Sequence, residues 1–498
     1  MSFAEKLEKL KNILGAVSDL RAASELLDWD MRTYMAPGSI DSRSLQLATL
    51  GETAHEKTTS REFGKLIGKL ARKAKKLDPD SDERRLIEKV FKNYEKERRL
   101  PAEWVRRNAE ACSRANTAWE RARKEKNFKT FAPHLQELLD LTFERLSWFE
   151  PYEHPYDPLL DRFDEGVTCA DLEPVFARLK KEQSEIIRAA LKKPAPDTAF
   201  LNGSFPAAKQ IRLTEEVLTR MGYDWNCGRQ DTTVHPFTTT IGLYDVRVTT
   251  KVFPGKPFSA LFSSVHEGGH ALYEQGIDKR YARTPLGDGA SFSIHESQSR
   301  LWENLVARSP EFWQFWYPRV RKLYPAALKN VPMEKFLAAL NAVEASPIRV
   351  EADELTYNMH IILRFELEKA MLEGKLKAAD LAEAWNAGMK DLLGIEIRDD
   401  AEGVLQDVHW AMGEFGYFPS YAIGNVISAQ LWNAALRDHP EIPQRIAQGD
   451  YAPLREWLCS RVHVHGAKYT TSEILRIATG NGTLDPTPYL KMLKHKYA

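Results

Sequence analysis

The sequence predicts a mainly α-helical protein with one small β-hairpin, and three observations favour this fold class. Apolar residues recur at steps of three and four, as the buried face of a helix requires. The first such stretch consists of Leu7, Leu10, Ile13, Leu14, Val17 and Leu20. The same spacing returns at Leu86, Ile87, Val90, Phe91 and Tyr94, and again at Leu135, Leu138, Leu139, Phe143 and Leu146. Only residues 231–252, rich in Thr and Val, alternate with a period of two, which is typical of strands.

Charge and loop signals complete the outline of the N-terminal part. Residues 68–126 are rich in Lys, Arg and Glu, and we interpret them as long helices with solvated faces rather than as a binding surface. Residues 192–206 combine Pro, Gly and Asn, which is typical of a loop.

The predicted hairpin has Gly242 between its two runs. Pro236 lacks a backbone N–H, which favours an edge strand for the first run. In the second run, Asp245, Arg247 and Thr249 are expected on one face, because side chains alternate along a strand. Taken alone, this pattern is explained most simply as the polar outer face of a small sheet.

The composition limits the classes of function. The 498 residues include 70 Lys and Arg and 70 Asp and Glu, so the formal net charge is zero, which argues against a nucleic-acid-binding protein. The four cysteines form no Cys-x-x-Cys pair, which indicates a reducing compartment. No apolar run approaches the ~18 residues of a membrane span, and the N-terminus has no signal-peptide core. We therefore expect a cytoplasmic protein that binds neither nucleic acid nor membrane.

The strongest chemical signal is the pattern His266-Glu267-Gly268-Gly269-His270 within a predicted helix over residues 257–276. Histidines at positions i and i+4 face the same way, so both imidazoles can reach one zinc ion. Glu267 can then act as the general base toward the water that the metal activates. Two glycines inside a helix each cost about 1 kcal/mol relative to Ala. A close backbone approach at the site would explain them better than a purely structural helix does.

A third metal ligand has to come from another element. Glu274 lies about 12 Å along the helix from His266, which is too far for one ion. Downstream, a second predicted helix carries Glu296 in its first turn and Glu303 two turns later. Ser293 and Glu296 would also form a capping box, and spacing alone does not choose between Glu296 and Glu303.

Six ordered motifs make the chain resemble the carboxypeptidase Taq family of zinc metallocarboxypeptidases, a gluzincin-type HExxH family. They are His235-Pro236-Phe237, Asp245-x-Arg247-x-Thr249, His266-Glu267-x-x-His270, His295-Glu296-Ser297-Gln298, Ile348-Arg349-x-x-Ala352-Asp353 and Gly403-x-x-Gln406-Asp407-x-His409-Trp410. The likeness covers essentially the whole chain, without a departure at any motif position.

The resemblance implies a large helical fold around a deep substrate groove, with the zinc helix at its floor. It implies that His266, His270 and Glu296 bind one zinc ion per chain, which cobalt can replace, and that Glu267 is the catalytic base. It further implies a homodimer that removes C-terminal residues from peptides with broad specificity. Because the motifs converge on one site, we expect a single peptidase domain over 1–498. Its N-terminal helical lobe would span about 1–205 and its active-site region about 206–498.

A carboxypeptidase needs a cation for the terminal carboxylate of its substrate, and Arg349 is the first candidate. Ser346-Pro347 suggests the start of a helix. Arg349 would then stand in the first turn, where a positive charge is unfavourable unless an anion also binds there. The alternative is a simple ion pair of Arg349 with Asp353 on one helix face.

Further residues are predicted to bind substrate. Arg247 and His235 belong to the hairpin region, which could align an extended peptide through its edge. His409 and Tyr421 are candidates to donate to the developing oxyanion, as is Tyr417. Ordinary aromatic packing around Trp410 would explain these residues as well.

The sequence thus predicts a zinc-dependent carboxypeptidase. One alternative is a zinc oligopeptidase or endopeptidase that uses the same ion and base. The other is a helical peptide-binding protein without enzymatic activity.

Overall fold

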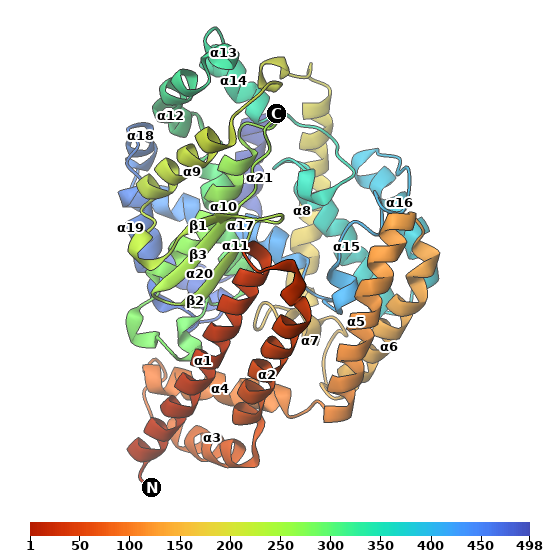
Figure 1. Ribbon diagram of the computed structural model, residues 1–498, viewed down its shortest axis with the longest axis vertical. Coiled ribbons are helices and arrows are strands. Elements are labelled where there is room, and N and C mark those ends of the chain that lie inside the picture. Colours follow the sequence, from red (N-terminus) through yellow and green to blue (C-terminus); the bar gives the residue numbers. More distant parts are fainter.

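The computed structural model describes residues 1–498, and the N-terminal part is helical as predicted (Figure 1). Its helices are α1 (Phe3–Thr33), α2 (Ile40–Thr59), α3 (Arg61–Ala74), α4 (Asp82–Glu97), α5 (Ala102–Glu125), α6 (Ala132–Ser147), α7 (Asp157–Leu160) and α8 (Cys169–Leu191). The predicted loop over 192–206 separates α8 from α9 (Ala207–Met221) and contains one short 3₁₀ turn.

The rest of the chain contains a small sheet and the remaining helices. The strands are β1 (Gln230–Thr232), β2 (Thr238–Gly242) and β3 (Asp245–Thr250). The longer helices that follow are α10 (Ser259–Gly276), α12 (Pro310–Leu323), α15 (Tyr357–Leu372), α16 (Leu381–Leu393) and α17 (Pro419–Asp438). The shorter ones are α11 (Phe292–Arg300), α13 (Pro325–Leu328), α14 (Met333–Leu340), α18 (Ile442–Ala447), α19 (Ala452–Arg461), α20 (Thr471–Thr479) and α21 (Thr487–Tyr497).

The apolar faces predicted from the sequence pack inward. Leu7, Leu10, Leu14 and Val17 of α1 are buried, and so are the leucines at 135, 138, 139 and 146 of α6. Phe143 is the exception, because its side chain is 39% exposed. One cluster of buried apolar side chains extends from Leu7 to Tyr497, so the N-terminal helices share a core with the rest of the chain.

The charged stretch has the solvated faces that its composition predicts. Ion pairs one turn apart run along its helices, as between Arg84 and Glu88 at 2.8 Å and between Arg106 and Glu110 at 2.9 Å. Pairs of this kind at the surface contribute a few tenths of a kcal/mol each. They make the long helices compatible with water without forming a site.

The predicted hairpin is present, but it forms only part of a three-stranded sheet. β2 and β3 are antiparallel, and β1 pairs in parallel with β3, which gives the order β1-β3-β2. The first run of the hairpin, β2, is an edge strand, as predicted, although Pro236 itself lies just before it in the loop between β1 and β2. Its missing N–H helps to end the pairing there. β2 contacts α1 and β3 contacts α10, so the sheet links the N-terminal hairpin of helices to the helix with the HExxH motif.

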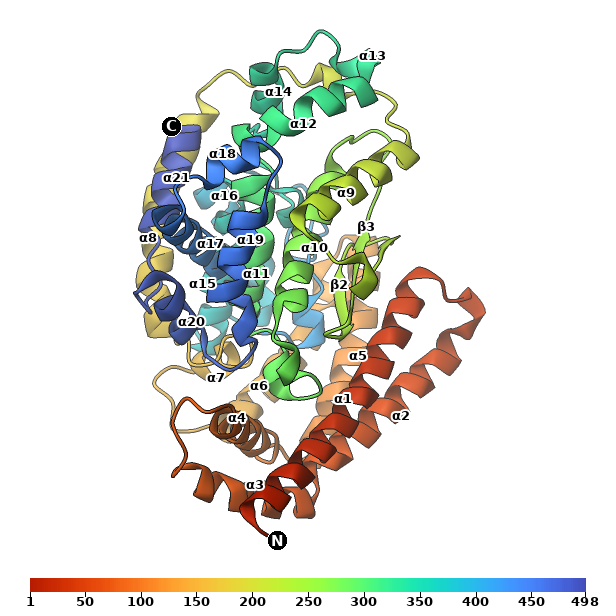
Figure 2. The same ribbon diagram turned by 90° about the vertical axis from the view of Figure 1, so that its left-hand side faces the viewer.

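The two ends of the molecule frame the active-site helices. Helices α1–α4 lie at one end and α12–α14 at the other (Figure 2). Between them, α11 contacts α10 and α17, and α17 contacts α15. None of the helices combines the length and the apolar character that a membrane span needs.

Glu368 forms a buried polar centre on α15. Its carboxylate accepts hydrogen bonds from Trp410 Nε1 at 2.6 Å, from the backbone N–H of Gly416 at 2.9 Å and from the hydroxyl of Tyr156. Burial raises the pKa of Glu368 to about 7. The Glu368 carboxylate therefore links the segment 409–417 to α15, and its charge changes near neutral pH.

This network predicts a pH-dependent contribution to stability. The folded-state pKa of about 7 lies above the ordinary value of 4.5. The folded state thus holds the proton more tightly, and the contribution falls as pH rises from about 5 to 7. Relative to a Glu368→Gln variant, we expect the free energy of unfolding of the unaltered protein to drop by about 1–3 kcal/mol over this range. Urea denaturation at a series of pH values measures the difference, and a difference independent of pH would contradict the assignment.

Candidate active site

The helix α10 presents its HExxH motif where two other helices approach it closely. A Cβ at Gly269 would lie 2.7 Å from the backbone of Gln298 and Ser299 in α11. On the other side of α11, a Cβ at Gly424 of α17 would lie 2.7 Å from the Glu296 side chain. Contacts this short exclude any side chain larger than hydrogen. The close approach predicted from the glycine pair is therefore present, and it places α11 beside the two histidines.

The side chains of His266, His270 and Glu296 converge. Their ligand atoms all lie within 4.8 Å of one another. Oε2 of Glu296 is 3.7 Å from Nε2 of His266 and 3.5 Å from Nε2 of His270. Two donors on one tetrahedral zinc ion are about 3.4 Å apart, given bond lengths near 2.0–2.2 Å. The two imidazoles and the carboxylate thus fit a divalent ion in both donor type and spacing.

Arg300, the last residue of α11, and Glu303, on the turn that follows this helix, support the cluster. Arg300 Nε donates to Oε1 of Glu296 at 2.6 Å, which leaves Oε2 of that carboxylate facing the histidines. Glu303 stands on a π-helical turn, Leu301–Val306, and its Oε2 is 2.9 Å from Nδ1 of His266. Burial opposes ionisation, but His266 and Arg300 lower the pKa of Glu303 to about 2. The sequence spacing did not decide whether Glu296 or Glu303 is the third candidate ligand. In the structure, Glu296 faces Nε2 of both histidines. Glu303 instead contacts Nδ1 on the opposite side of the His266 ring.

His270 is held by a second imidazole rather than by a carboxylate. Its Nδ1 lies 2.7 Å from Nδ1 of His295, and Nε2 of His295 lies 2.6 Å from Oε1 of Glu274. With Nε2 of His270 facing the cluster, Nδ1–H of His270 donates to His295, and Nε2–H of His295 donates to Glu274. Glu274, too distant to be a ligand, thus ends the hydrogen-bonded chain behind His270.

Glu267 lies beside the cluster in a buried position. The Thr238 hydroxyl on β2 is 2.7 Å from Oε2 of Glu267 and 2.9 Å from its backbone oxygen. Burial raises the pKa of Glu267 above its ordinary value, although His266 and Thr238 act against this. A carboxylate with a raised pKa is a stronger base, as proton abstraction from water requires.

Arg349 is buried, but not at the start of an α-helix. The prediction of a helix from Ser346-Pro347 is wrong: Arg349–Glu351 is one 3₁₀ turn and α15 begins at Tyr357. The reason is a local turn, in which Oδ1 of Asp353 accepts the N–H groups of Leu355 and Thr356 at 2.9 and 3.0 Å. The alternative ion pair of Arg349 with Asp353 is also absent.

The partner of Arg349 is Asp407. Oδ1 of Asp407 accepts from Nη2 and Nε of Arg349 at 2.8 and 3.1 Å. Nη1 of Arg349 donates to the Tyr357 hydroxyl at 3.0 Å, and its backbone N–H donates to Gln406 Oε1 at 2.8 Å. Burial opposes the charge of Arg349, and Asp407 raises its pKa further above the ordinary value, so the guanidinium is a permanent cation.

Tyr417, Tyr421 and His409 form an aromatic group beside Arg349. The guanidinium of Arg349 is 5.0 Å from the Tyr421 ring centre, and the rings of Tyr417 and Tyr421 are 5.4 Å apart. His409 stacks on Tyr417 at 5.1 Å, and its Nδ1 is buried without a hydrogen-bond partner. Burial raises the pKa of Tyr417 to about 12 and raises that of Tyr421, with the Glu296 charge adding to both. Both phenols therefore keep their protons and remain hydrogen-bond donors.

The two hairpin residues lie in different surroundings. Arg247 shares one face of β3 with Asp245, as predicted, but donates to that carboxylate at 2.8 and 2.7 Å and stacks on Trp29 at 4.4 Å. His235 is exposed in the bend between β1 and β2 and makes no hydrogen bond or ion pair. The structure thus joins Arg247 to the sheet and α1, whereas His235 has no fixed partner.

Sequence reasoning missed several contacts that organise the site. Arg300 follows Glu296 by four residues on one helix, a spacing that signals an ion pair. Thr238, Tyr357 and Arg364 carry no such signal, because their partners are distant in sequence and only the fold brings them together.

Comparison with known proteins gives the family. The model of the carboxypeptidase Taq (M32) metallopeptidase family matches residues 9–497. The chain belongs to this family. It is therefore a metallocarboxypeptidase, a hydrolase of peptide bonds.

Relatives resemble this metallocarboxypeptidase over its full length. Carboxypeptidase 1 of Bacillus subtilis is 39% identical over 98% of this chain and 97% of its own. Thermostable carboxypeptidase 1 of Thermus thermophilus is 38% identical over 96% of both chains. The crystal structure of the M32 carboxypeptidase from Deinococcus radiodurans R1 is 40% identical, covers 99% of each chain and superposes with a TM-score of 0.96.

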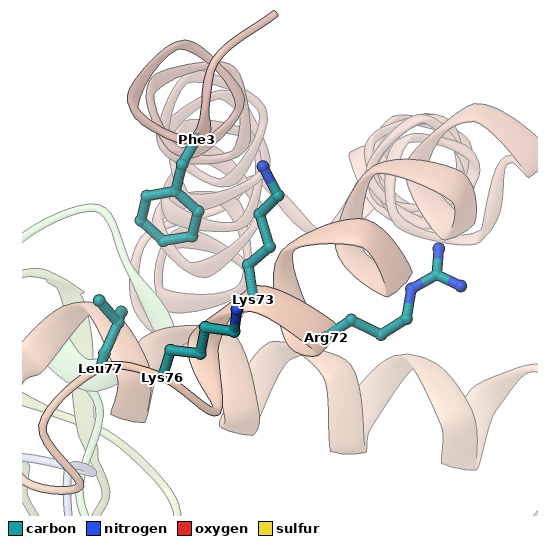
Figure 3. A pocket seen from close by; sticks show the side chains of 5 residues that line it. All are labelled: Phe3, Arg72, Lys73, Lys76 and Leu77. Atoms are coloured by element: carbon teal, nitrogen blue, oxygen red, sulfur yellow. The ribbon is translucent and has the colours of Figure 1, made fainter.

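A surface hollow of about 490 Å³ lies elsewhere, at the N-terminal end of the metallocarboxypeptidase (Figure 3). It is lined by Phe3, Arg72, Lys73, Lys76 and Leu77. The hollow joins the start of α1 to the end of α3 and the turn after it. It contains cations and apolar groups but no carboxylate or imidazole, so it offers no hydrolytic chemistry.

The chain behind His270 predicts an effect on metal affinity. Replacement of His295 by Phe removes the hydrogen bond to Nδ1 of His270, and we expect zinc affinity to fall about 10–100-fold. Competition with a chromophoric chelator measures this directly. His463→Phe is the matched control, because His463 is a nearby buried histidine that contacts Gln298 and no candidate ligand. Unchanged affinity in His295→Phe, or an equal loss in the control, would contradict the assignment.

Proposed function

We propose that the protein is a zinc metallocarboxypeptidase that removes C-terminal amino acids from peptides with broad specificity. The observation that carries the proposal is a continuous set of contacts between the candidate metal site and a buried cation. Arg300 donates to Glu296 at 2.6 Å and stacks on Tyr357 at 4.4 Å, and the Tyr357 hydroxyl accepts from Arg349 at 3.0 Å. Such contacts would hold a carboxylate anchor at a fixed position relative to the bond to be cut.

His266, His270 and Glu296 would hold the ion. Zinc bound there would polarise the scissile carbonyl and make a water molecule acidic near neutral pH, and cobalt could replace it. Protein side chains would carry out the proton transfers. Glu267 takes a proton from water onto its carboxylate and delivers it to the leaving amine, while Thr238 keeps that carboxylate oriented through its 2.7 Å hydrogen bond.

Other residues would position the substrate. Arg349 holds the terminal carboxylate, which limits cleavage to the last peptide bond. Tyr421, with Tyr417 and His409 stacked nearby, donates to the developing oxyanion. Arg247 on β3 and the exposed His235 contact the peptide on its N-terminal side, where the β2 edge can align an extended chain.

We also propose a single peptidase domain, a homodimer and a cytoplasmic location. The continuous core from Leu7 to Tyr497 supports one domain over 1–498, with lobes of about 1–205 and 206–498. The four free cysteines fit a reducing compartment. The dimer rests on the family likeness, and light scattering coupled to size-exclusion chromatography tests it.

The role of Glu267 leads to the first functional prediction. Glu267→Gln keeps the shape and the hydrogen bond from Thr238 but removes the base, so kcat should fall about 10²–10⁴-fold. Substrate binding and zinc content should stay within a few-fold of the unaltered protein. Peptide hydrolysis by mass spectrometry, with zinc content by atomic emission, measures both. Substantial activity in the zinc-loaded variant would remove Glu267 from this role.

The carboxylate anchor separates a carboxypeptidase from an oligopeptidase. Peptides with a free C-terminus should be trimmed stepwise, whereas the same peptides with an amidated C-terminus should resist, because Arg349 then has no anion to bind. Arg349→Ala should lower kcat/KM for free peptides about 100-fold or more. A mass-spectrometric time course on matched free and amidated peptides, with and without chelator, distinguishes a carboxypeptidase from an oligopeptidase. Equal cleavage of free and amidated peptides would favour the oligopeptidase.

A further inference from the structure

We propose that Arg364 is a positioning residue for recognition of the substrate carboxylate. It neutralises Asp407, so that Arg349 keeps a positive charge for the substrate. The inference rests on the proposed role of Arg349 and extends it to a residue on α15 that no substrate can touch.

Two arginines share a single carboxylate. Arg349 donates to Oδ1 of Asp407 at 2.8 and 3.1 Å, while Nε and Nη2 of Arg364 donate to Oδ2 at 2.8 and 2.5 Å. Each oxygen of Asp407 is thus occupied by one guanidinium fork. The three groups together carry one surplus positive charge.

The neighbouring groups do not cancel this charge. Burial lowers the pKa of His409 to about 4 and that of His360 to about 3, so both imidazoles are neutral. Glu368 stands one turn along α15, but burial raises its pKa to about 7, so it carries a proton below neutral pH. Its carboxyl group is hydrogen-bonded to Tyr156, Trp410 and Gly416 and makes no hydrogen bond to either guanidinium. The carboxylate in direct contact with the two arginines is that of Asp407.

The two arginines differ in what they can reach. Arg364 is fully buried, donates to the backbone oxygen of His360 at 2.7 Å and stacks on Trp385 at 4.4 Å. Arg349 is 7% exposed and uses three of its five N–H groups on Asp407 and Tyr357. The remaining two can bind a carboxylate in the bidentate manner typical of arginine. Arg364 therefore acts only through Asp407.

The charge balance explains why a second arginine is needed. An isolated pair of Arg349 and Asp407 would be neutral, and Asp407 would repel the incoming carboxylate about as strongly as Arg349 attracts it. Burial makes an uncompensated charge costly, so the surplus has to be held by well-formed hydrogen bonds until substrate arrives. Asp407 holds both forks in place, and Arg364 restores the attraction that Asp407 would otherwise cancel.

The test measures binding in the zinc-loaded Glu267→Gln background, where peptides are not consumed. Isothermal titration calorimetry compares one peptide with a free C-terminus and its amidated form. Arg364→Met should lower the affinity for the peptide with a free C-terminus at least about tenfold and leave the affinity for the amidated peptide nearly unchanged. The double variant Arg364→Met/Asp407→Asn loses one charge of each sign and should recover most of the affinity. Arg145→Met is the control, because Arg145 packs on Trp104 and Phe149 in the N-terminal helices.

Asp407→Asn alone keeps the inference testable if Arg364→Met does not fold. It raises the surplus charge, so the free peptide should bind as tightly as before or more tightly. A loss of affinity for the free peptide in Asp407→Asn would overturn the inference. So would an equal loss of affinity for both peptides in Arg364→Met, or a failure of Asp407→Asn to restore the affinity in the double variant. Equal binding of free and amidated peptides by the Glu267→Gln parent would instead refute the role of Arg349 itself.

Discussion

The contact of α11 with the helices on either side of it is the constraint on which the site depends. Gly269 on α10 and Gly424 on α17 leave no room for a Cβ against α11. Each glycine inside a helix costs about 1 kcal/mol relative to Ala, and the packing of three buried helices offsets that cost. Because α11 is fixed from both sides, Glu296 reaches the two histidines of α10 without a loop between them. Rigid helices hold ligand geometry more precisely than loops do.

Charge is distributed so that few groups at the site are left unpaired. Glu296 is bound by Arg300, His266 by Glu303, and His270 by a chain through His295 to Glu274. Buried charges in such numbers are tolerated only when each has a partner. The neutral net charge of the chain therefore does not describe the charge of this site, where two arginines share the single carboxylate of Asp407.

Short-range patterns predicted the helices, the hairpin and the close approach at Gly269, because periodicity and glycine placement are local signals. The prediction of a helix beginning at Ser346-Pro347 was wrong, because the side chain of Asp353 accepts the N–H groups of Leu355 and Thr356 and forms a tight turn before α15. The strand β1 was missed, since its parallel pairing with β3 requires a connection that no local pattern encodes. The gathering of His266, His270 and Glu296 follows the motifs and the family likeness. Tyr357 of α15 contacts Arg300 and Arg349, and Arg364 of the same helix contacts Asp407. Only tertiary packing brings these partners together.

The same contacts couple the candidate metal site to the proposed carboxylate anchor. Arg300 touches both Glu296 and the Tyr357 ring, and Tyr357 accepts a hydrogen bond from Arg349. A displacement of α15 would therefore move Arg349 and Arg364 together and disturb Arg300 through Tyr357. A misplacement of about 1 Å can cost a hundredfold in rate, so on the proposed roles the position of α15 would matter for catalysis although Arg364 and Glu368 are too buried to meet the substrate. The buried face of α15 would then be as important for the proposed mechanism as the HExxH helix.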